Sequence, residues 1–389
     1  MEGVGAGDLS DAVRMARLLL ILLAWCAPVA AQVPWQTCTR CDATGKLCCE
    51  KHEDPQCSGE EEVLYCSVIA GCGACGGSGF VPCEACVNPE ARKWLEERRE
   101  RVRQREAGLR SIDDTMGRPL RKAETAHFVF VWEMEGIKVE KRRVEPHEAL
   151  HLYSRRMESL FADYLRTLAT DDAQFREKTW VFVWFLPKDH VDGSRKFCEV
   201  SPTKGGVKLM GIHSRYSILG NRNEFRTDEQ LHRNIVHSVS HLLLSAQRPT
   251  AWIGNMKGGW LDEGLAHWFE DRVCGICDNY CMQEDNPNVS FEKGRYRFGI
   301  RKLVAKGDLP SISEITSKNV DTLTVEMNAI VFSYVDYLIP MGGEKLDALV
   351  KKLKNKVPAG EAVREVYGMN LLELEERWKA WVLETYPTR

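Results

Sequence analysis

Two histidines four residues apart constrain the fold of this chain more than any other feature of its sequence. His237 and His241 lie in a segment whose periodicity predicts a helix from about residue 228 to residue 246. Residues four apart project from the same face of a helix, where two imidazoles can bind one metal ion. The apolar positions of this segment fall on another stripe, so the histidine face can line a cleft. The alternative is a pair of hydrogen-bonded histidines without a metal.

A second segment, 260–266 (Trp-Leu-Asp-Glu-Gly-Leu-Ala), follows at a spacing that suits a second helix beside the first. Glu263 at the start of that helix can supply a third metal ligand and leave a fourth position for water. His267 and Glu270 follow four and seven residues later on the same face. They could orient the ligands through hydrogen bonds, although two solvated side chains on an exposed face would explain them equally well.

Together the two segments resemble the peptidase MA-like (gluzincin) metallopeptidases, in which a Trp-Leu-x-Glu-Gly-x-Ala segment follows a His-Glu-x-x-His helix. The resemblance implies an α+β fold, with a small sheet and helices around a cleft and a helical C-terminal part. It also implies a zinc ion held by His237, His241 and Glu263. Over residues 125–389, predicted strands at 126–132, 180–186 and 206–213, with a helix at 148–168, come in the order that this fold would have. Helices are predicted at 329–338, 345–353 and 371–381.

The chain departs from that family at Ser238, which stands at the position of the motif glutamate. In active members this glutamate takes a proton from the attacking water, and a serine hydroxyl is too weak a base to do so near neutral pH. A positioned general base contributes on the order of 10²–10⁴ in rate, so hydrolysis should be severely impaired. The sequence therefore assigns no catalytic residue.

An internal repeat with metal-ligand spacing fills residues 38 to 86, which contain ten of the fifteen cysteines. Each copy has two ligand pairs separated by seven residues, and every pair has the spacing of a site in which both side chains meet one ion. We predict one structural zinc per copy, and the repeated spacing favours zinc over a disulfide scaffold. The ligands of the first copy are Cys38, Cys41, Cys49 and His52; those of the second are Cys72, Cys75, Cys83 and Cys86.

The segment 72–79 (Cys-Gly-Ala-Cys-Gly-Gly-Ser-Gly) resembles the cysteine-rich zinc domain of the J-domain cochaperones. The resemblance implies a small zinc-binding unit at residues 32–90, hereafter the cysteine-rich module. Cys48, Cys57 and Cys66 lie outside the repeat and could be spare ligands, bridge partners or buried thiols. The module carries a run of acidic residues, which argues against nucleic acid as a partner.

Four cysteines of the later chain form a looser pattern. They could form a third tetrathiolate site or two disulfides, and the sequence favours neither alternative. The four residues are Cys198, Cys274, Cys277 and Cys281.

The N-terminal residues 1–31 have the pattern of an export signal. Arg14 and Arg17 precede an apolar run at 18–26, which is too short to span a bilayer comfortably, and a cleavage site near Ala31 follows. We predict a periplasmic or extracellular protein; if the segment is retained instead, it would anchor the chain to a membrane. Residues 91–124 are dense in interleaved charges and are predicted to form a helical linker.

Three functions are compatible with these patterns. The first is an exported pseudopeptidase that binds a peptide or protein partner. The second is an active zinc metallopeptidase that uses another carboxylate, such as Glu270 or Asp262. The third is a non-enzymatic scaffold in which all zinc is structural. The formal net charge of -3 provides no global field that would attract nucleic acid.

Overall fold

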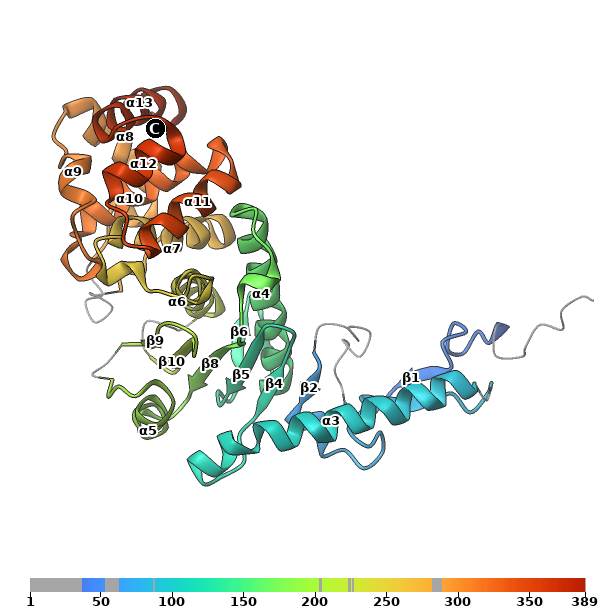
Figure 1. The fold of residues 1–389 in the computed structure, drawn as a ribbon. Coiled ribbons are helices and arrows are strands. Elements are labelled where there is room, and N and C mark those ends of the chain that lie inside the picture. The colour runs from blue at the N-terminus through green and yellow to red at the C-terminus, as the bar shows by residue number, and fades with distance from the viewer. Residues whose placement is uncertain are drawn as a thin grey trace, which may run out of the picture.

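The computed structural model describes residues 37–52, 63–86, 88–202, 205–222, 225, 227–281 and 289–388. The predicted export signal and Cys57 lie outside these ranges. The chain is mixed α and β, with a cysteine-rich arm that projects from a larger body of sheet and helices (Figure 1).

The strands have two to six residues each, and helices predominate in the described chain after β10. The strands are β1 (Lys46–Cys48), β2 (Tyr65–Cys66), β3 (Phe80–Pro82), β4 (Lys122–Glu124), β5 (Phe128–Trp132), β6 (Ile137–Val139), β7 (Arg142–Val144), β8 (Thr179–Trp184), β9 (Val207–Leu209) and β10 (Arg215–Leu219). The helices are α2 (Ser67–Ala70), α3 (Pro89–Met116), α4 (Pro146–Thr167), α5 (Pro187–Cys198), α6 (Asp228–Ala246), α7 (Gly259–Cys274), α8 (Tyr296–Lys306), α9 (Ile312–Ile315), α10 (Val325–Leu338), α11 (Gly343–Lys354), α12 (Ala359–Tyr367) and α13 (Leu371–Thr385).

A six-stranded sheet in the order β2-β4-β5-β8-β10-β9 forms the centre of the body. Strands β5, β8 and β10 are parallel to one another, and the other pairings are antiparallel. Because side chains alternate along a strand, Phe128, Phe130 and Trp132 face the core that contains α4 and α6. Val129 and Val131 face the opposite side, where they pack with residues of α3 and α5. Both faces of the sheet are therefore covered by helices.

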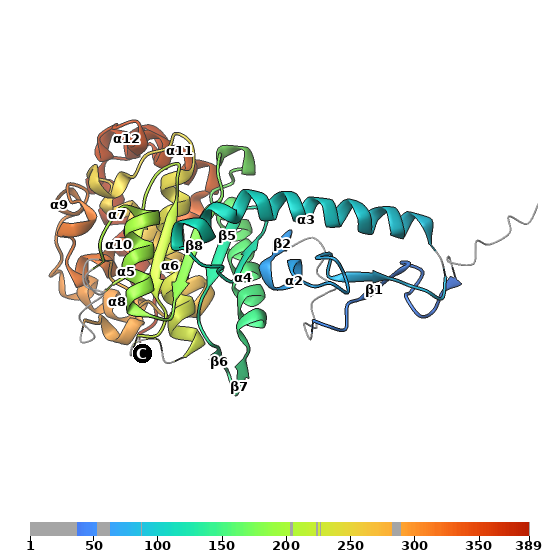
Figure 2. The ribbon, with the colours of Figure 1, turned by 90° about the horizontal axis from the view of Figure 1, so that it is seen from below.

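Helix α3 joins the cysteine-rich module to the body, and both views show it running along the module and on towards the sheet (Figures 1 and 2). The predicted linker is helical, but it is not solvated on all sides. Leu95, Val102, Leu109 and Ile112 are buried at successive intervals of seven, seven and three residues, so one stripe of the helix packs while the charges face water. The same segment continues into β4, which belongs to the sheet.

The helical half positions the site through close contact of α7 with α6 and α10. Gly264 lies where α7 meets α10, and a Cβ atom at this position would come within 2.6 Å of the Val331 backbone oxygen and 2.7 Å of Val335 Cγ2. Only glycine permits this approach, which holds the neighbouring Glu263 against α6.

Several predicted elements are confirmed. The histidine helix α6 spans residues 228–246, as expected from its periodicity. The predicted helices near 148–168 and 329–338 correspond to α4 and α10, and the strands near 126–132 and 180–186 correspond to β5 and β8. Within the described ranges, no helix is both long and apolar enough to cross a lipid bilayer.

Candidate metal centres

Helix α6 carries both histidines on its buried face and is fixed at its start by contacts with α4. Thr227 and Gln230 form a capping box, which satisfies backbone groups of the first turn. The Asp228 carboxylate accepts hydrogen bonds from Tyr153 and from both NH groups of Arg156. His237 and His241 follow with 0 % and 1 % exposure.

The structure brings His237, His241 and Glu263 together and adds Cys281 to them; these four residues are called the histidine centre. The two histidine Nε2 atoms lie 3.2 Å apart, and Glu263 Oε2 lies 3.5 Å and 3.6 Å from them. The sulfur of Cys281 lies 3.2 Å from each Nε2. The thiol of Cys281 therefore lies at the fourth ligand position, which was expected to be open for water. The prediction of three protein ligands is corrected to four candidate ligands.

The distances in this centre fit a tetrahedral metal ion. Zinc–nitrogen distances of about 2.0–2.1 Å and a zinc–sulfur distance of about 2.3 Å give nitrogen–nitrogen edges of about 3.3 Å and nitrogen–sulfur edges of about 3.6 Å. The observed separations lie within about 0.4 Å of these edges. Glu263 Oε2 is also buried without a hydrogen-bond partner among the described residues, and a bound cation would satisfy it.

Cys281 reaches α6 because the segment after α7 turns back across it and is held there. Asp278 accepts two hydrogen bonds from Arg233 of α6. Asn279 accepts one from Asn234 and donates one to Glu270. These contacts lie two and three residues before Cys281, and they fix the sulfur against the histidines. Sequence spacing could not indicate this return of the chain.

Carboxylates contact the second ring nitrogen of each histidine. Glu270 Oε2 lies 3.1 Å from His237 Nδ1 and 3.3 Å from His267 Nδ1. His267 is fully buried, and its Nε2 lies 3.7 Å from Glu263 Oε2. Asp262 Oδ1 lies 2.9 Å from His241 Nδ1, a role that the sequence analysis did not assign to it. A carboxylate at Nδ1 directs the metal-binding lone pair to Nε2.

Opposite charges are concentrated in the histidine centre. Burial alone would lower the pKa of His237, but Cys281 and Glu263 raise this pKa well above its ordinary value. Burial would raise the pKa of Glu263, but His241 and His237 hold it well below the usual range. For Cys281, burial and Glu263 raise the pKa, whereas His241, Lys208 and His237 lower it, and the outcome is about 7. A metal ion would replace the histidine protons, so its binding should release protons.

Ser238 has only a weakly basic hydroxyl, and both nearby carboxylates are in contact with other side chains. Ser238 Oγ is buried and has no hydrogen-bond partner among the described residues. Glu270 Oε1 accepts hydrogen bonds from the Asp278 backbone and from Asn279, while its Oε2 serves the histidines. Asp262 Oδ2 accepts from Trp252 Nε1 at 2.8 Å, and its other oxygen faces His241.

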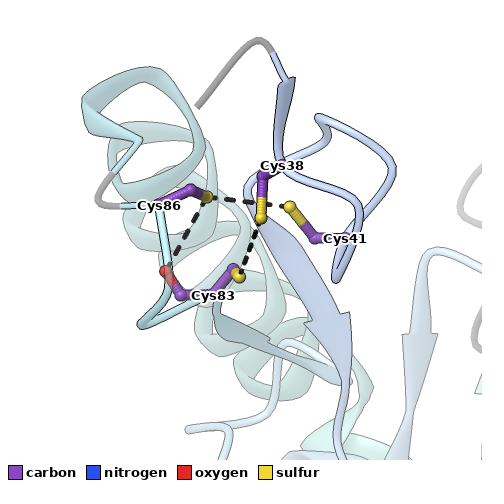
Figure 3. Close-up of side chains that lie close together, drawn as sticks. All are labelled: Cys38, Cys41, Cys83 and Cys86. Atoms are coloured by element: carbon purple, nitrogen blue, oxygen red, sulfur yellow. Dashed lines mark hydrogen bonds between the residues drawn. The ribbon is translucent and has the colours of Figure 1, made fainter. Parts of the chain in front are cut away.

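The cysteine-rich module contains two further ligand groups, and their membership corrects the prediction of one site per copy. The first cysteine centre combines ligands of both copies (Figure 3). Its sulfurs are 3.9 Å apart for Cys38 and Cys83, and 3.7 Å apart for Cys41 and Cys86. A tetrahedral tetrathiolate zinc site has sulfur–sulfur edges of about 3.8 Å.

The second cysteine centre consists of Cys49, His52, Cys72 and Cys75. Cys49 and Cys72 have their sulfurs 4.0 Å apart, and His52 Nε2 lies 3.4 Å from Cys75 Sγ. The physical reason for the exchange is the antiparallel pairing of β1 with β3. Each strand separates the two ligand pairs of its own copy, so the antiparallel arrangement puts the beginning of one copy beside the end of the other.

The four later cysteines form neither of the groups considered for them. Cys198 is buried behind the sheet with Phe197, and Cys277 is buried in the main core, where its thiol contacts the backbone oxygen of His267. Cys274 is partly exposed, and Cys281 belongs to the histidine centre. All four are free thiols, so both the tetrathiolate site and the two disulfides are wrong. Cys48 is exposed on β1 and is also free.

A pocket of about 390 Å³ adjoins the histidine centre. Its wall includes His241, Asp262 and Cys281, together with Lys208 from the edge strand β9. Lys208 Nζ lies 3.1 Å from the sulfur of Cys281. The pocket is thus continuous with the candidate metal ligands and is open to an approaching molecule.

Comparison of the sequence with models of protein families gave no match, and comparison with curated proteins gave none either. The structure supports a mixed α and β chain in which, among the described residues, five groups of side chains are positioned to hold a metal ion, two of them sharing His237. The identity of the metal and the activity have to be argued from the geometry.

Proposed function

We propose that this chain is an exported gluzincin-like protein that holds zinc in a closed site and acts by binding a peptide or protein partner rather than by hydrolysis. The single observation that carries the proposal is the sulfur of Cys281 at 3.2 Å from both His237 Nε2 and His241 Nε2. Structural zinc sites have four protein ligands, whereas catalytic sites keep one position open. A thiol in the fourth position supports a structural role.

The family assignment is supported by the relation of α6 to α7. One helix supplies the His-x3-His pair, and the next supplies the glutamate of the Trp-Leu-x-Glu-Gly-x-Ala segment. Zinc is favoured because two imidazoles, a carboxylate and a thiolate are donors that it accepts in tetrahedral sites. A bound zinc ion would supply Lewis acidity and folding energy; this chain's own residues hold and orient the ligands.

Loss of hydrolysis is supported by the state of every candidate base. Ser238 cannot accept a proton near neutral pH, and Asp262 and Glu270 are already engaged with histidine ring nitrogens. The alternative of an active peptidase requires Cys281 to leave the centre and another carboxylate to enter it. The alternative of a scaffold without metal at the histidine centre leaves Glu263 Oε2 unsatisfied.

The decisive experiment measures zinc content and peptide hydrolysis in one preparation of the full chain. We expect Glu263→Ala to lose one zinc equivalent, while Glu376→Ala, an exposed glutamate on α13, loses none. We expect no peptide turnover above that of His241→Ala. Turnover that disappears in His241→Ala would overturn the proposal, and unchanged zinc in Glu263→Ala would favour the metal-free scaffold.

A complementary experiment restores the missing parts of a catalytic site. Ser238→Glu introduces a base, and Cys281→Ala removes the thiol from the fourth position. We expect Ser238→Glu alone to stay inactive, because the thiol still fills that position, and the double variant to gain zinc-dependent peptidase activity. Activity in Ser238→Glu alone would show that the thiol does not close the site.

Partner binding is assigned to the pocket beside the histidine centre. Val200 lines this pocket and is 48 % exposed, so it offers an apolar contact to a peptide. Peptides selected from a random library for binding to the wild-type chain should lose affinity for Val200→Asp. They should retain it for Leu372→Asp, which changes an exposed leucine on α13 that does not line the pocket. Equal loss in both variants would argue against this pocket.

A further inference from the structure

A second His-x3-His pair lies at the start of α4, and it meets a cysteine that falls outside the repeat of the cysteine-rich module. His147 and His151 are four residues apart in α4, so they share one face of the helix. Cys66 is on β2, the edge strand of the six-stranded sheet. Strand β2 comes from the cysteine-rich module and α4 from the body, so the three side chains meet where these parts join.

The ligand atoms of the three residues are close enough for one ion. All of them lie within 4.8 Å of one another, and His147 Nε2 is 3.0 Å from His151 Nε2. In a tetrahedral zinc site two imidazole nitrogens are about 3.3 Å apart, so the observed separation is near that of two ligands. Cys66 is 4 % exposed and His151 is 5 % exposed, while His147 is half-buried.

The direction in which Cys66 projects is set by the strand. Tyr65 and Cys66 are adjacent on β2, so they face opposite sides of the sheet. Tyr65 packs with α3 residues on one side, and Cys66 joins the core cluster that includes residues of α4. The pairing of Cys66 with Ala123 of β4 keeps this register. The cysteine is thus directed to the helix face that carries the histidines.

We propose that Cys66, His147 and His151 bind a further metal ion, which links the cysteine-rich module to the body. One thiolate and two imidazoles form a donor set that zinc accepts, and three protein ligands leave a fourth position for water or another ligand. The site adjoins the second cysteine centre, because the His52 and His147 rings are 6.4 Å apart. It is independent of the proposed function, since it shares no residue with the histidine centre.

The test counts metal per chain by elemental analysis of the folded full-length protein. We expect Cys66→Ser and His147→Gln each to lose one equivalent, and the double variant to lose only one in total. Matched controls are Cys48→Ser and His213→Gln, which change an exposed cysteine and an exposed histidine outside every ligand group and should lose none. Unchanged metal in both Cys66→Ser and His147→Gln would overturn the proposal and leave a hydrogen-bonded histidine pair.

A second comparison separates this site from the neighbouring cysteine centre. Cys72→Ser removes a ligand of the second cysteine centre, so the double variant with His147→Gln should lose one equivalent more than Cys72→Ser alone. An equal loss in the two would mean that His147→Gln acts by disturbing that centre, and the proposal would fail. If Cys66→Ser does not fold, His147→Gln still decides the question, because His147 is only half-buried.

Discussion

Replacing Glu270 with glutamine should weaken metal binding at the histidine centre by about 10- to 100-fold, which corresponds to about 1.4–2.7 kcal/mol. Glu270 is fully buried, and its two oxygens have different partners. Oε1 accepts hydrogen bonds from the Asp278 backbone N at 2.8 Å and from Asn279 Nδ2 at 2.6 Å. Oε2 lies 3.1 Å from His237 Nδ1 and 3.3 Å from His267 Nδ1.

The magnitude follows from what a glutamine can offer these partners. Both groups at Oε1 are donors, so the single oxygen of the amide must stay there, and its NH₂ group then faces His237 Nδ1. When His237 binds a metal through Nε2, its Nδ1 carries the proton, and two donors oppose each other. This repulsion between donors is avoided only if the proton moves from Nδ1 to Nε2, the atom that would bind the metal. Affinity therefore falls although no ligand has been removed.

The assay is competition for zinc between the full chain and a chromophoric chelator. In Glu270→Gln, one zinc equivalent should bind more weakly than in the wild type. The other zinc equivalents should bind with unchanged affinity. Glu158→Gln is the matched control, because Glu158 Oε2 makes a similar contact with His127 Nδ1, at 2.6 Å, outside the histidine centre. Identical curves for the wild type and folded Glu270→Gln would refute the reasoning.

Three other predictions concern stability. Burial alone would lower the pKa of His127, but Glu158 raises it, while His127 lowers the pKa of Glu158. Their pair therefore stabilises the fold fully between about pH 4.3 and about pH 6.5, and progressively less as the pH rises through the raised pKa of His127. Denaturant unfolding should accordingly give Glu158→Gln a deficit of about 1 kcal/mol near pH 6 that shrinks by about pH 9; a constant deficit would contradict this sign. Gly264→Ala should cost about 1–3 kcal/mol in the same assay, because its Cβ would lie 2.6 Å from a backbone oxygen of α10, whereas Gly108→Ala in open space should gain about 0.5–1 kcal/mol. Removal of bound metal by a chelator under reducing conditions should abolish the protection of backbone amides from hydrogen exchange in the cysteine-rich module. The amides of α10–α13 should stay protected. Retained protection in the module would show that its metals are dispensable for folding.

The histidine centre could be predicted in part because its main signals are local. Two histidines four residues apart share a helix face whatever surrounds the helix, and the periodicity of α6 gave its bounds. Glu263 could be proposed from the segment that it belongs to. Cys281 could not, since its place depends on a turn of the chain that is held by Arg233 and Glu270. No spacing rule describes such a tertiary contact.

The cysteine-rich module illustrates the same limit at shorter range. A Cys-x2-Cys pair indicates two ligands of one ion, but the spacing does not say which second pair completes the site. That choice depends on the register of β1 with β3, in which Lys46 faces Pro82 and Cys48 faces Phe80. The strands have three residues each and little hydrophobic alternation, so no pattern in their residues indicates how they pair. His147 and His151 did carry a readable signal, the same i, i+4 spacing as in α6.

The two departures of the histidine centre from a hydrolytic site reinforce each other electrostatically. If Ser238 were the only change, a zinc ion together with two neutral imidazoles, Glu263 and water would have one net positive charge, and the buried carboxylates of Asp262 and Glu270 would face it only through the histidine rings. A net charge is costly to bury, and an added thiolate from Cys281 brings the sum of ligand and metal charges to zero. Removing that thiolate should therefore both open the site and weaken zinc binding. The double variant Ser238→Glu, Cys281→Ala tests this argument. Its new carboxylate is the only added charge that could replace the negative charge of the lost thiolate.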